Sequence, residues 1–368
     1  MTFPASPPAP PIPPPVGLLA ELTHRCPPQC PYCSNPLNLE SVRGEHTTAQ
    51  WCDVFRQAGE IGVQQVHLSG GEPASRRDLE ALVEGAAKAG LYSNLITSGV
   101  GLTRPRLERL AAAGLDHVQL SIQDADAANS DRIAGYAGGF QRKMEVAGHI
   151  RSLGLPLTVN APVHRQNLDR LEDIIALAVR LGALRLEVAH VQYYAWALAN
   201  RAALMPARAQ VERSIEIVAR ARERLKGVLT IEFVAPDYYA DLPKPCMGGW
   251  GLGVINVTPS GLALPCHAAQ SLPGLVFDNV IDRPLAEIWQ SSTAFQAYRG
   301  TDWMREPCRS CDRRTIDFGG CRCQAMALTG DAANTDPACA KSPRHGELAA
   351  LAATASANPP PPLRYRRM

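Results

Sequence analysis

Three cysteines near the N-terminus are spaced closely enough to hold one metal centre. Cys26, Cys30 and Cys33 form a C-x3-C-x2-C pattern in a proline-containing loop that follows an apolar, β-rich run. Thiolate sulfurs favour zinc or iron–sulfur sites. A structural zinc ion requires four ligands, whereas three cysteines leave one iron of a [4Fe–4S] cluster open to another molecule. The pattern therefore predicts such a cluster; the alternative is a zinc site completed by His24 or Cys52.

Cysteine usage over the whole chain favours the same chemistry. The chain has 368 residues, of which 11 are cysteine, and an odd number does not suit a fully paired set of disulfides. In a reducing compartment, clustered cysteines more often serve metal or redox chemistry. Cys52 stands apart from the others and is expected to be a small buried hydrophobe in a helix.

Charge and hydropathy argue against several classes of partner. The net charge is +2, and the sequence shows neither a basic excess, nor an apolar run of transmembrane length, nor an N-terminal secretory pattern. We therefore expect a cytoplasmic protein with no nucleic-acid partner and no membrane partner.

Elements that alternate along the chain must position the cysteines. Short apolar, β-rich runs occupy residues 16–23, 65–69, 93–97, 117–122, 156–161 and 184–190. Stretches of helical periodicity follow them, as at residues 76–89, 104–113, 141–153 and 168–181. Repeated strand–helix units imply parallel strands joined by right-handed crossovers. Six such units predict an α/β fold, a (β/α)6 partial TIM barrel that is open relative to the eight-unit form.

The sequence changes in character near residue 240. A helix over residues 207–226 and a strand over 229–233 are expected before this point, and a β-hairpin over 253–264 after it. Because continuous apolar sequence then becomes sparse, we expect bound metal rather than a conventional core to organise this region. The predicted divisions are a disordered proline-rich segment (1–15), the barrel (16–240), a cysteine-rich domain (241–345) and a disordered proline-rich tail (346–368) with solvated arginines.

Glycines and polar residues follow the predicted strands. Gly70, Gly71 and Glu72 come directly after the second strand, in the sequence GGEP, and glycine lets the backbone approach a ligand. Later strands end in further polar residues, namely Thr97, Ser98, Ser121 and Asn160. Serine and threonine at strand ends are also common helix caps, and Asn160 could equally be a satisfied polar residue.

With the aromatic Tyr32 between the last two cysteines, these motifs resemble the radical S-adenosylmethionine (SAM) superfamily. The resemblance implies that SAM binds the open iron and that one electron breaks its sulfonium–C5′ bond, giving methionine and a 5′-deoxyadenosyl radical. It also implies that the SAM contacts are made by Tyr32, Gly70, Gly71, Glu72, Thr97, Ser98, Ser121 and Asn160. A non-catalytic iron–sulfur or zinc protein would not need the GGEP motif.

The second cysteine group resembles the SPASM extension of radical SAM peptide-modifying enzymes, which binds two auxiliary clusters. Its members are Cys246, Cys266, Cys308, Cys311, Cys321, Cys323 and Cys339. Where the family's run has a further cysteine, this chain has Asp317, followed by C-x-C. Asp317 could be a surface acid, but seven cysteines and one carboxylate make eight ligands, enough for two closed four-ligand clusters of the [4Fe–4S] or [2Fe–2S] type.

The ligand count leads to one assignment for each auxiliary site. Cys246, Cys266, Cys321 and Cys323 are expected to hold one cluster. Cys308, Cys311, Asp317 and Cys339 are expected to hold the other, with the harder oxygen ligand altering its potential. Two zinc sites are the alternative.

The carboxylate in the SPASM run, with residues 17–26 and 191–197, resembles the PqqE family of pyrroloquinoline quinone biosynthesis. The resemblance implies a carbon–carbon cross-link between a glutamate and a tyrosine of the precursor peptide PqqA. It also implies delivery of PqqA by the chaperone PqqD, an electron donor such as flavodoxin, and an auxiliary cluster as electron acceptor. Another SPASM enzyme, acting on a different peptide or a tetrapyrrole, is the alternative.

Two features near the predicted strand ends have no assigned role. His164, Glu187 and His190 could each supply a base or be structural. The aromatic run at residues 191–197 could face the substrate or pack in the core.

Overall fold

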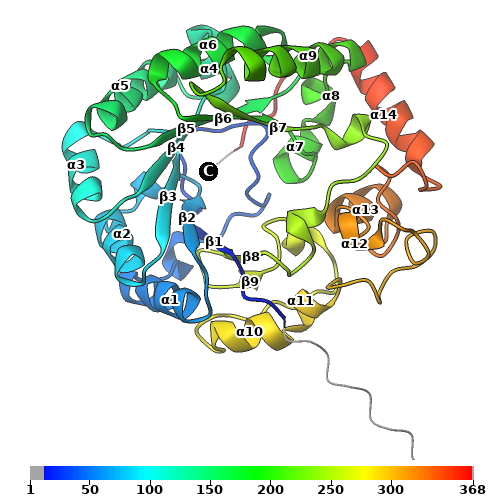
Figure 1. Cartoon of the computed structure of the whole chain (residues 1–368), viewed down its shortest axis with the longest axis horizontal. Coiled ribbons are helices and arrows are strands. Elements are labelled where there is room, and N and C mark those ends of the chain that lie inside the picture. The colour runs from blue at the N-terminus through cyan, green and yellow to red at the C-terminus, as the bar shows by residue number, and fades with distance from the viewer. Residues whose placement is uncertain (1–11, 367–368) are drawn as a thin grey trace, which may run out of the picture.

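The computed structural model describes residues 12–366 and is built around one nine-stranded sheet. The strand order is β7-β6-β5-β4-β3-β2-β1-β8-β9, and helices surround the curved sheet on its outside (Figure 1). All pairs are parallel except β8 with β9. No pairing joins β7 to β9 among the described strands, so the barrel is open, as predicted.

The strands confirm the expected alternation of units. Their bounds are β1 (Gly17–Thr23), β2 (Gln65–Gly70), β3 (Tyr92–Thr97), β4 (His117–Ser121), β5 (Leu157–Val163), β6 (Arg185–His190), β7 (Thr230–Val234), β8 (Val254–Val257) and β9 (Ala263–Leu264). Six strand–helix units form the (β/α)6 barrel, and the strand expected at residues 229–233 extends it as β7.

The helices fall into those that cover the barrel and those that follow it. The barrel helices are α1 (Thr48–Glu60), α2 (Leu79–Lys88), α3 (Arg104–Ala112), α4 (Ala127–Ala134), α5 (Gly139–Ser152), α6 (Leu171–Leu181), α7 (Ala195–Ala199), α8 (Arg201–Leu204) and α9 (Arg208–Arg224). The later helices are α10 (Leu285–Ser291), α11 (Thr293–Gln296), α12 (Arg314–Asp317), α13 (Arg322–Thr329) and α14 (His345–Ala357). No described helix has the length and apolar character needed to cross a membrane.

The two faces of the barrel strands differ in chemistry because side chains alternate along a strand. Ala20, Leu68 and Leu95 are paired neighbours on three strands, and all are fully buried in the core shared with the helices. The alternate positions carry polar side chains. Asn94 Nδ2 on β3 donates to Gln119 Oε1 on β4 (3.2 Å), and Gln119 Nε2 donates to Glu187 Oε2 on β6 (2.9 Å). The barrel interior is therefore polar and hydrogen-bonded.

The expected hairpin forms as β8 and β9, but it does not stand apart from the barrel. β8 pairs in parallel with β1, and Ile255, Ile288 and Trp289 belong to the same core as the barrel strands. The prediction that this region lacks a conventional core is therefore wrong for residues 254–295. Apolar residues that are scattered in sequence converge there on the edge strand of the barrel.

Both predicted disordered ends need correction within the described residues. Residues 1–11 lie outside them, but the Pro13 carbonyl accepts a hydrogen bond from Trp289 Nε1 (2.9 Å). Residues 345–357 form α14, and the chain then continues to Arg366, whose side chain is buried rather than solvated. Proline-rich composition did not reveal these contacts, because they are made with residues far away in sequence.

Gly59 tests how closely α1 packs against the end of α2, and Gly148 in α5 is the control. A Cβ at Gly59 in α1 would lie 2.6 Å from the Ala89 carbonyl oxygen, whereas a Cβ at Gly148 in α5 would meet nothing within 4 Å. We expect Gly59→Ala to lower the free energy of unfolding by about 1–3 kcal/mol through overpacking. Gly148→Ala should raise it by roughly 1 kcal/mol, because alanine favours the helix. Urea unfolding measures both, and equal effects would contradict the packing described.

Candidate functional site

The first cysteine group lies in the loop after β1, at the carboxyl ends of the barrel strands. Cys26, Cys30 and Cys33 line one cavity of about 320 Å³. Contacts to distant elements hold the loop in place: Gln29 N donates to the Ala134 carbonyl (2.7 Å) and Asn200 Nδ2 donates to the Pro31 carbonyl (2.9 Å). The loop is thus part of the barrel mouth.

Burial controls the protonation of these thiols. It raises the pKa of Cys33 to about 11 and raises the pKa of Cys26 and of Cys30, while the positive charge of Arg366 acts in the opposite direction on all three. A metal-bound thiol is deprotonated outright. Three half-buried thiols around one cavity fit an iron–sulfur cluster, whose iron would supply the positive charge that the thiolates need.

The two residues considered for a fourth zinc ligand are engaged elsewhere. His24 Nδ1 accepts from the Glu40 backbone N–H (2.9 Å), and its Nε2 lies 3.2 Å from Glu21 Oε2. Cys52 is on α1, half-buried, with its side chain beside Gly85 of α2. Neither side chain is among those lining the cavity of the three cysteines.

The GGEP turn joins the cysteine loop through its backbone. Gly71 N donates to the Thr23 carbonyl (2.6 Å) and Glu72 N donates to the Arg25 carbonyl (2.7 Å). A Cβ at Gly71 would lie 2.3 Å from the Arg25 carbonyl oxygen, so only glycine permits this approach. The turn after β2 therefore sets the start of the cysteine loop.

Glu72 has its own partners. Its side chain is fully buried, and its carboxylate accepts from Thr97 Oγ1 (2.7 Å), Ser98 N (2.7 Å) and Ala74 N (3.0 Å). Burial raises the pKa of Glu72, against the effect of these hydrogen bonds. The side chain thus joins the end of β2 to the end of β3, and it does not line the cavity.

The remaining predicted contact residues do line this cavity. They are Tyr32, Gly70, Gly71, Thr97, Ser98, Ser121 and Asn160. Asn160 Oδ1 is buried without a hydrogen-bond partner in the described chain, which leaves it available to a polar ligand. Glycine backbone and polar strand ends around one cavity suit a ligand such as SAM, which carries amino, carboxylate and hydroxyl groups.

Sequence reasoning missed Lys143, which lies near enough to the cysteine loop to be influenced by Cys30. Lys143 on α5 is buried, and its Nζ donates to Gln123 Oε1. Burial lowers the pKa of Lys143 to about 8, partly offset by Cys30. Gln123 lies at the cavity. A lysine amid apolar helix positions was the only sequence signal, and a helix surface lysine looks the same in sequence.

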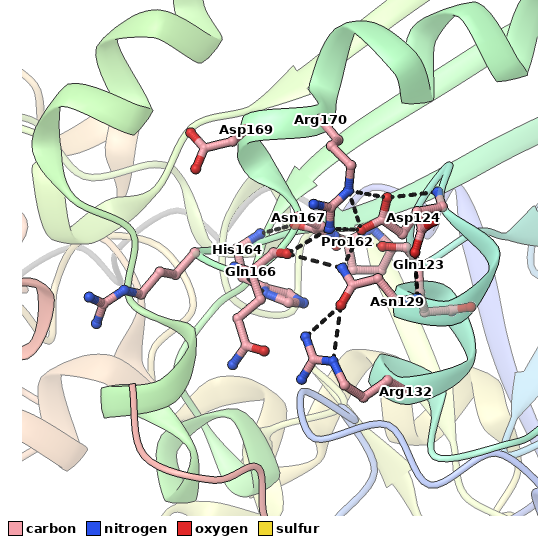
Figure 2. A network of polar contacts seen from close by, with 12 residues as sticks. Gln123, Asp124, Asn129, Arg132, Pro162, His164, Gln166, Asn167, Asp169 and Arg170 are labelled. Atoms are coloured by element: carbon pink, nitrogen blue, oxygen red, sulfur yellow. Dashed lines mark hydrogen bonds and ion pairs between the residues drawn. The ribbon is translucent and has the colours of Figure 1, made fainter. Parts of the chain in front are cut away.

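A polar network holds Gln123 in place (Figure 2). Asn167 Nδ2 donates to the carbonyls of Gln123 (2.7 Å) and Pro162 (2.9 Å), which joins the ends of β4 and β5. Next to it, Arg170 Nε donates to Asp124 Oδ1 (2.8 Å). These contacts set the relative positions of two strand ends that line the cavity.

The structure brings four cysteines of the second group together. Cys246, Cys266, Cys321 and Cys323 line one cavity of about 230 Å³, the same four that the ligand count assigned to one site. They come from the segments around β8 and β9 and from the start of α13, so the fold makes neighbours of thiols that lie far apart in sequence.

The other four predicted ligands form a separate pocket. Cys308, Cys311, Asp317 and Cys339 line it together. Asp317 is buried, with Oδ1 accepting from Gly319 N (3.1 Å) and Oδ2 facing Arg313 Nε (3.3 Å). The alternative in which Asp317 is a plain surface acid is therefore wrong, because its side chain is directed inward at the end of α12.

The aromatic run after β6 divides between two roles. Tyr193 packs in a small core against Tyr238, with ring centroids 4.9 Å apart. Tyr194 lines both the cavity of the first three cysteines and that of the next four, and its hydroxyl is hydrogen-bonded to His267 Nε2. The run is thus partly core and partly the wall between two sites.

The three residues considered as bases also differ in position. His190 lines the first cavity, and burial lowers its pKa to about 3. Glu187 accepts from Gln119 inside the barrel. His164 is fully buried against Tyr32, with ring centroids 5.7 Å apart. Only His190 therefore faces the space where a substrate could lie.

Comparisons with known proteins agree with this geometry. Residues 20–178 match the family model of the radical SAM superfamily, and residues 246–312 match that of an iron–sulfur cluster-binding domain, SPASM. Structures of similar fold include Streptococcus suis SuiB bound to S-adenosylmethionine, with a TM-score of 0.74 and 18% identity over 88% of this chain and 77% of SuiB. Another is anSMEcpe with bound AdoMet, with a TM-score of 0.64 and 14% identity over 93% of this chain and 92% of that chain.

The fold and these matches define a radical SAM enzyme with a SPASM domain. Closer relatives are "PqqA peptide cyclase" of Methylobacterium sp. (strain 4-46), 60% identical over 95% of this chain and 92% of the relative, and that of Methylorubrum extorquens (strain AM1), 58% identical over 99% and 94%. The chain belongs to the PqqA peptide cyclase family.

Glu72 provides a test of the turn geometry. Glu72→Gln places an amide NH2 where a carboxylate oxygen accepts hydrogen bonds, so one buried donor loses its partner. We expect the free energy of unfolding of the iron-free protein to fall by about 1–3 kcal/mol. The exposed Glu84, paired with Lys88, is the matched control, and Glu84→Gln should change stability by less than about 0.5 kcal/mol. Equal stability of the two variants would contradict the assignment.

Proposed function

We propose that this enzyme acts on the precursor peptide PqqA in pyrroloquinoline quinone biosynthesis and joins a glutamate and a tyrosine side chain by a carbon–carbon bond. The observation that carries the proposal is the convergence of Cys26, Cys30 and Cys33 with four polar residues from three strands on one cavity, in a chain about 60% identical to PqqA peptide cyclases. The named relatives support the peptide, and the site supports radical chemistry.

In this proposal Cys26, Cys30 and Cys33 hold a [4Fe–4S] cluster, and SAM occupies the cavity beside it. When bound, this pair supplies a 5′-deoxyadenosyl radical that can remove hydrogen from an unactivated C–H bond. The peptide must reach the same cavity, which is lined on one side by His190 and Tyr194. The polar barrel interior and the cysteine loop hold the reacting groups together and exclude water.

The cavity walls suggest how SAM is held. Gly70, Gly71, Ser121 and Asn160 line the cavity and are placed to contact SAM, although Gly71 N is already bonded to the Thr23 carbonyl. Thr97 and Ser98 are committed to Glu72. Glu72 therefore supports SAM binding indirectly, by fixing the ends of β2 and β3, and Tyr32 positions the loop between two cysteines.

The two further sets of ligands are assigned to auxiliary iron–sulfur clusters. Cys246, Cys266, Cys321 and Cys323 hold one, and Cys308, Cys311, Asp317 and Cys339 hold the other. The number of ligands suits either two-iron or four-iron forms.

We further propose the chaperone PqqD as the carrier of PqqA and a flavodoxin-like protein as electron donor. The division into a barrel over 16–240 and an auxiliary-cluster domain over 241–345 belongs to the same proposal.

The first experiment replaces the three loop cysteines. After anaerobic reconstitution with iron and sulfide, reduced enzyme with SAM should form 5′-deoxyadenosine, whereas the Cys26→Ala, Cys30→Ala, Cys33→Ala triple variant should form none. Cys52→Ala is the matched control and should keep the activity of the parent, because Cys52 is on α1 outside the cavity. Adding PqqA and PqqD should give the Glu–Tyr cross-link with the parent alone. Product from the triple variant would refute the proposal.

Asp317 is the second target. Asp317→Ala should remove one ligand and lower iron bound at that site, with cross-linking reduced about 10–100-fold. Asp317→Cys should retain the iron but change the reduction potential of the site. Asp302→Ala is the control, since Asp302 is exposed and does not line the pocket of Asp317. An unchanged potential and full cross-linking in Asp317→Cys would show that the carboxylate does not tune this site.

A further inference from the structure

The C-terminal segment after α14 returns to the mouth of the barrel (Figure 1). Asn200, between α7 and α8, is only 3% exposed, and its side-chain amide binds both the backbone N–H and the carbonyl of Arg364 in this segment. Its Oδ1 accepts from Arg364 N (2.7 Å), and its Nδ2 donates to the Arg364 carbonyl (2.9 Å) and to the Pro31 carbonyl in the cysteine loop (2.9 Å). One side chain thus connects the C-terminal segment to the loop.

The next two residues add contacts to the same loop and its neighbour. Tyr365 donates through its hydroxyl to the Arg132 carbonyl at the end of α4 (2.7 Å). Arg366 N donates to the Gln29 carbonyl in the cysteine loop (3.3 Å). Residues 364–366 therefore lie along the loop as a strap, anchored to three separate parts of the barrel mouth.

The Arg366 side chain binds the cysteine loop directly. It is fully buried, and its guanidinium donates to three loop carbonyls: His24 (3.2 Å), Cys26 (2.7 Å) and Pro28 (3.1 Å). Three carbonyls of one loop segment, gathered around one planar group, fix the backbone from which Cys26 projects. A lysine could not reach all three, because it presents a single nitrogen.

Within residues 12–366, the Arg366 guanidinium is hydrogen-bonded to backbone carbonyls and has no carboxylate partner. Its Nε has no hydrogen-bond partner in that part of the chain. A buried, unpaired cation is strongly unfavourable unless an anion lies nearby. The Arg366 guanidinium is hydrogen-bonded to the Cys26 carbonyl, and its charge acts on the thiols of Cys26, Cys30 and Cys33. The arrangement therefore suits a loop that carries negative charge on its sulfurs.

We propose that Arg366 is a positioning residue for the cluster held by Cys26, Cys30 and Cys33, and that residues 364–366 form a strap that fixes the cysteine loop. This inference rests on the proposed function. The guanidinium sets the backbone of the loop, and its positive charge compensates the thiolates, which makes reduction of the cluster easier. Because the strap comes from the end of the chain, the site is complete only when this segment is docked.

The test compares Arg366→Gln with Arg364→Gln, a matched control whose arginine is exposed two residues earlier. In the iron-free protein, Arg366→Gln should speed amide hydrogen exchange in residues 26–33 by at least about tenfold, because the loop loses three hydrogen bonds. In the reconstituted protein it should shift the reduction potential of the first cluster to a more negative value. Arg364→Gln should match the parent in both measurements.

Arg366→Lys separates the two effects. It retains the charge but not the three-carbonyl contact, so exchange should be faster while the potential stays close to that of the parent. Parent-like exchange in both Arg366 variants would overturn the proposal. Should Arg366→Gln not fold, the Arg366→Lys result decides alone. The exchange measurement uses iron-free protein, so it does not depend on whether the loop binds a cluster. Failure of the proposed function would show separately, as 5′-deoxyadenosine formed by the three-cysteine variant.

Discussion

The parallel arrangement of the barrel strands is the constraint on which the site depends. Since every strand from β1 to β6 ends at the same mouth, residues that follow different strands meet there although long stretches of sequence separate them. The cysteine loop follows β1, GGEP follows β2, and Ser121 and Asn160 end or lie near the end of β4 and β5. Backbone hydrogen bonds from Gly71 and Glu72 to the loop then fix the spacing between the first two of these.

Most buried charged side chains around the barrel mouth have hydrogen-bond partners. Glu72 is saturated by donors from β3, and Lys143 is bound to Gln123, which in turn is held through Asn167. Such groups are costly to bury without partners, so their presence indicates that the site is specified by a complete set of contacts. Arg366 differs because its charge lacks a carboxylate in the described chain, and the loop cysteines are the groups that can compensate it.

The second half of the chain is joined to the barrel in two ways. β8 continues the sheet beyond β1, so the segment that carries Cys246 and Cys266 is fixed relative to the first cysteine loop. Tyr194 and Gln192 line both cavities, so the two sites share a wall.

The sequence by itself determined the C-x3-C-x2-C loop, the GGEP turn, the alternating strands and helices, and which of the later cysteines share a pocket, with Asp317 among them. Each depends on residues close in the chain or on ligand count, which sequence records directly. Only the tertiary structure decided that Glu72 supports β3, that Lys143 lies near the loop, that β8 extends the barrel, and that the proline-rich C-terminal segment holds Arg366 against the cysteines. These contacts join residues 25 to more than 300 positions apart, and hydrophobic periodicity carries no information about which distant segments meet.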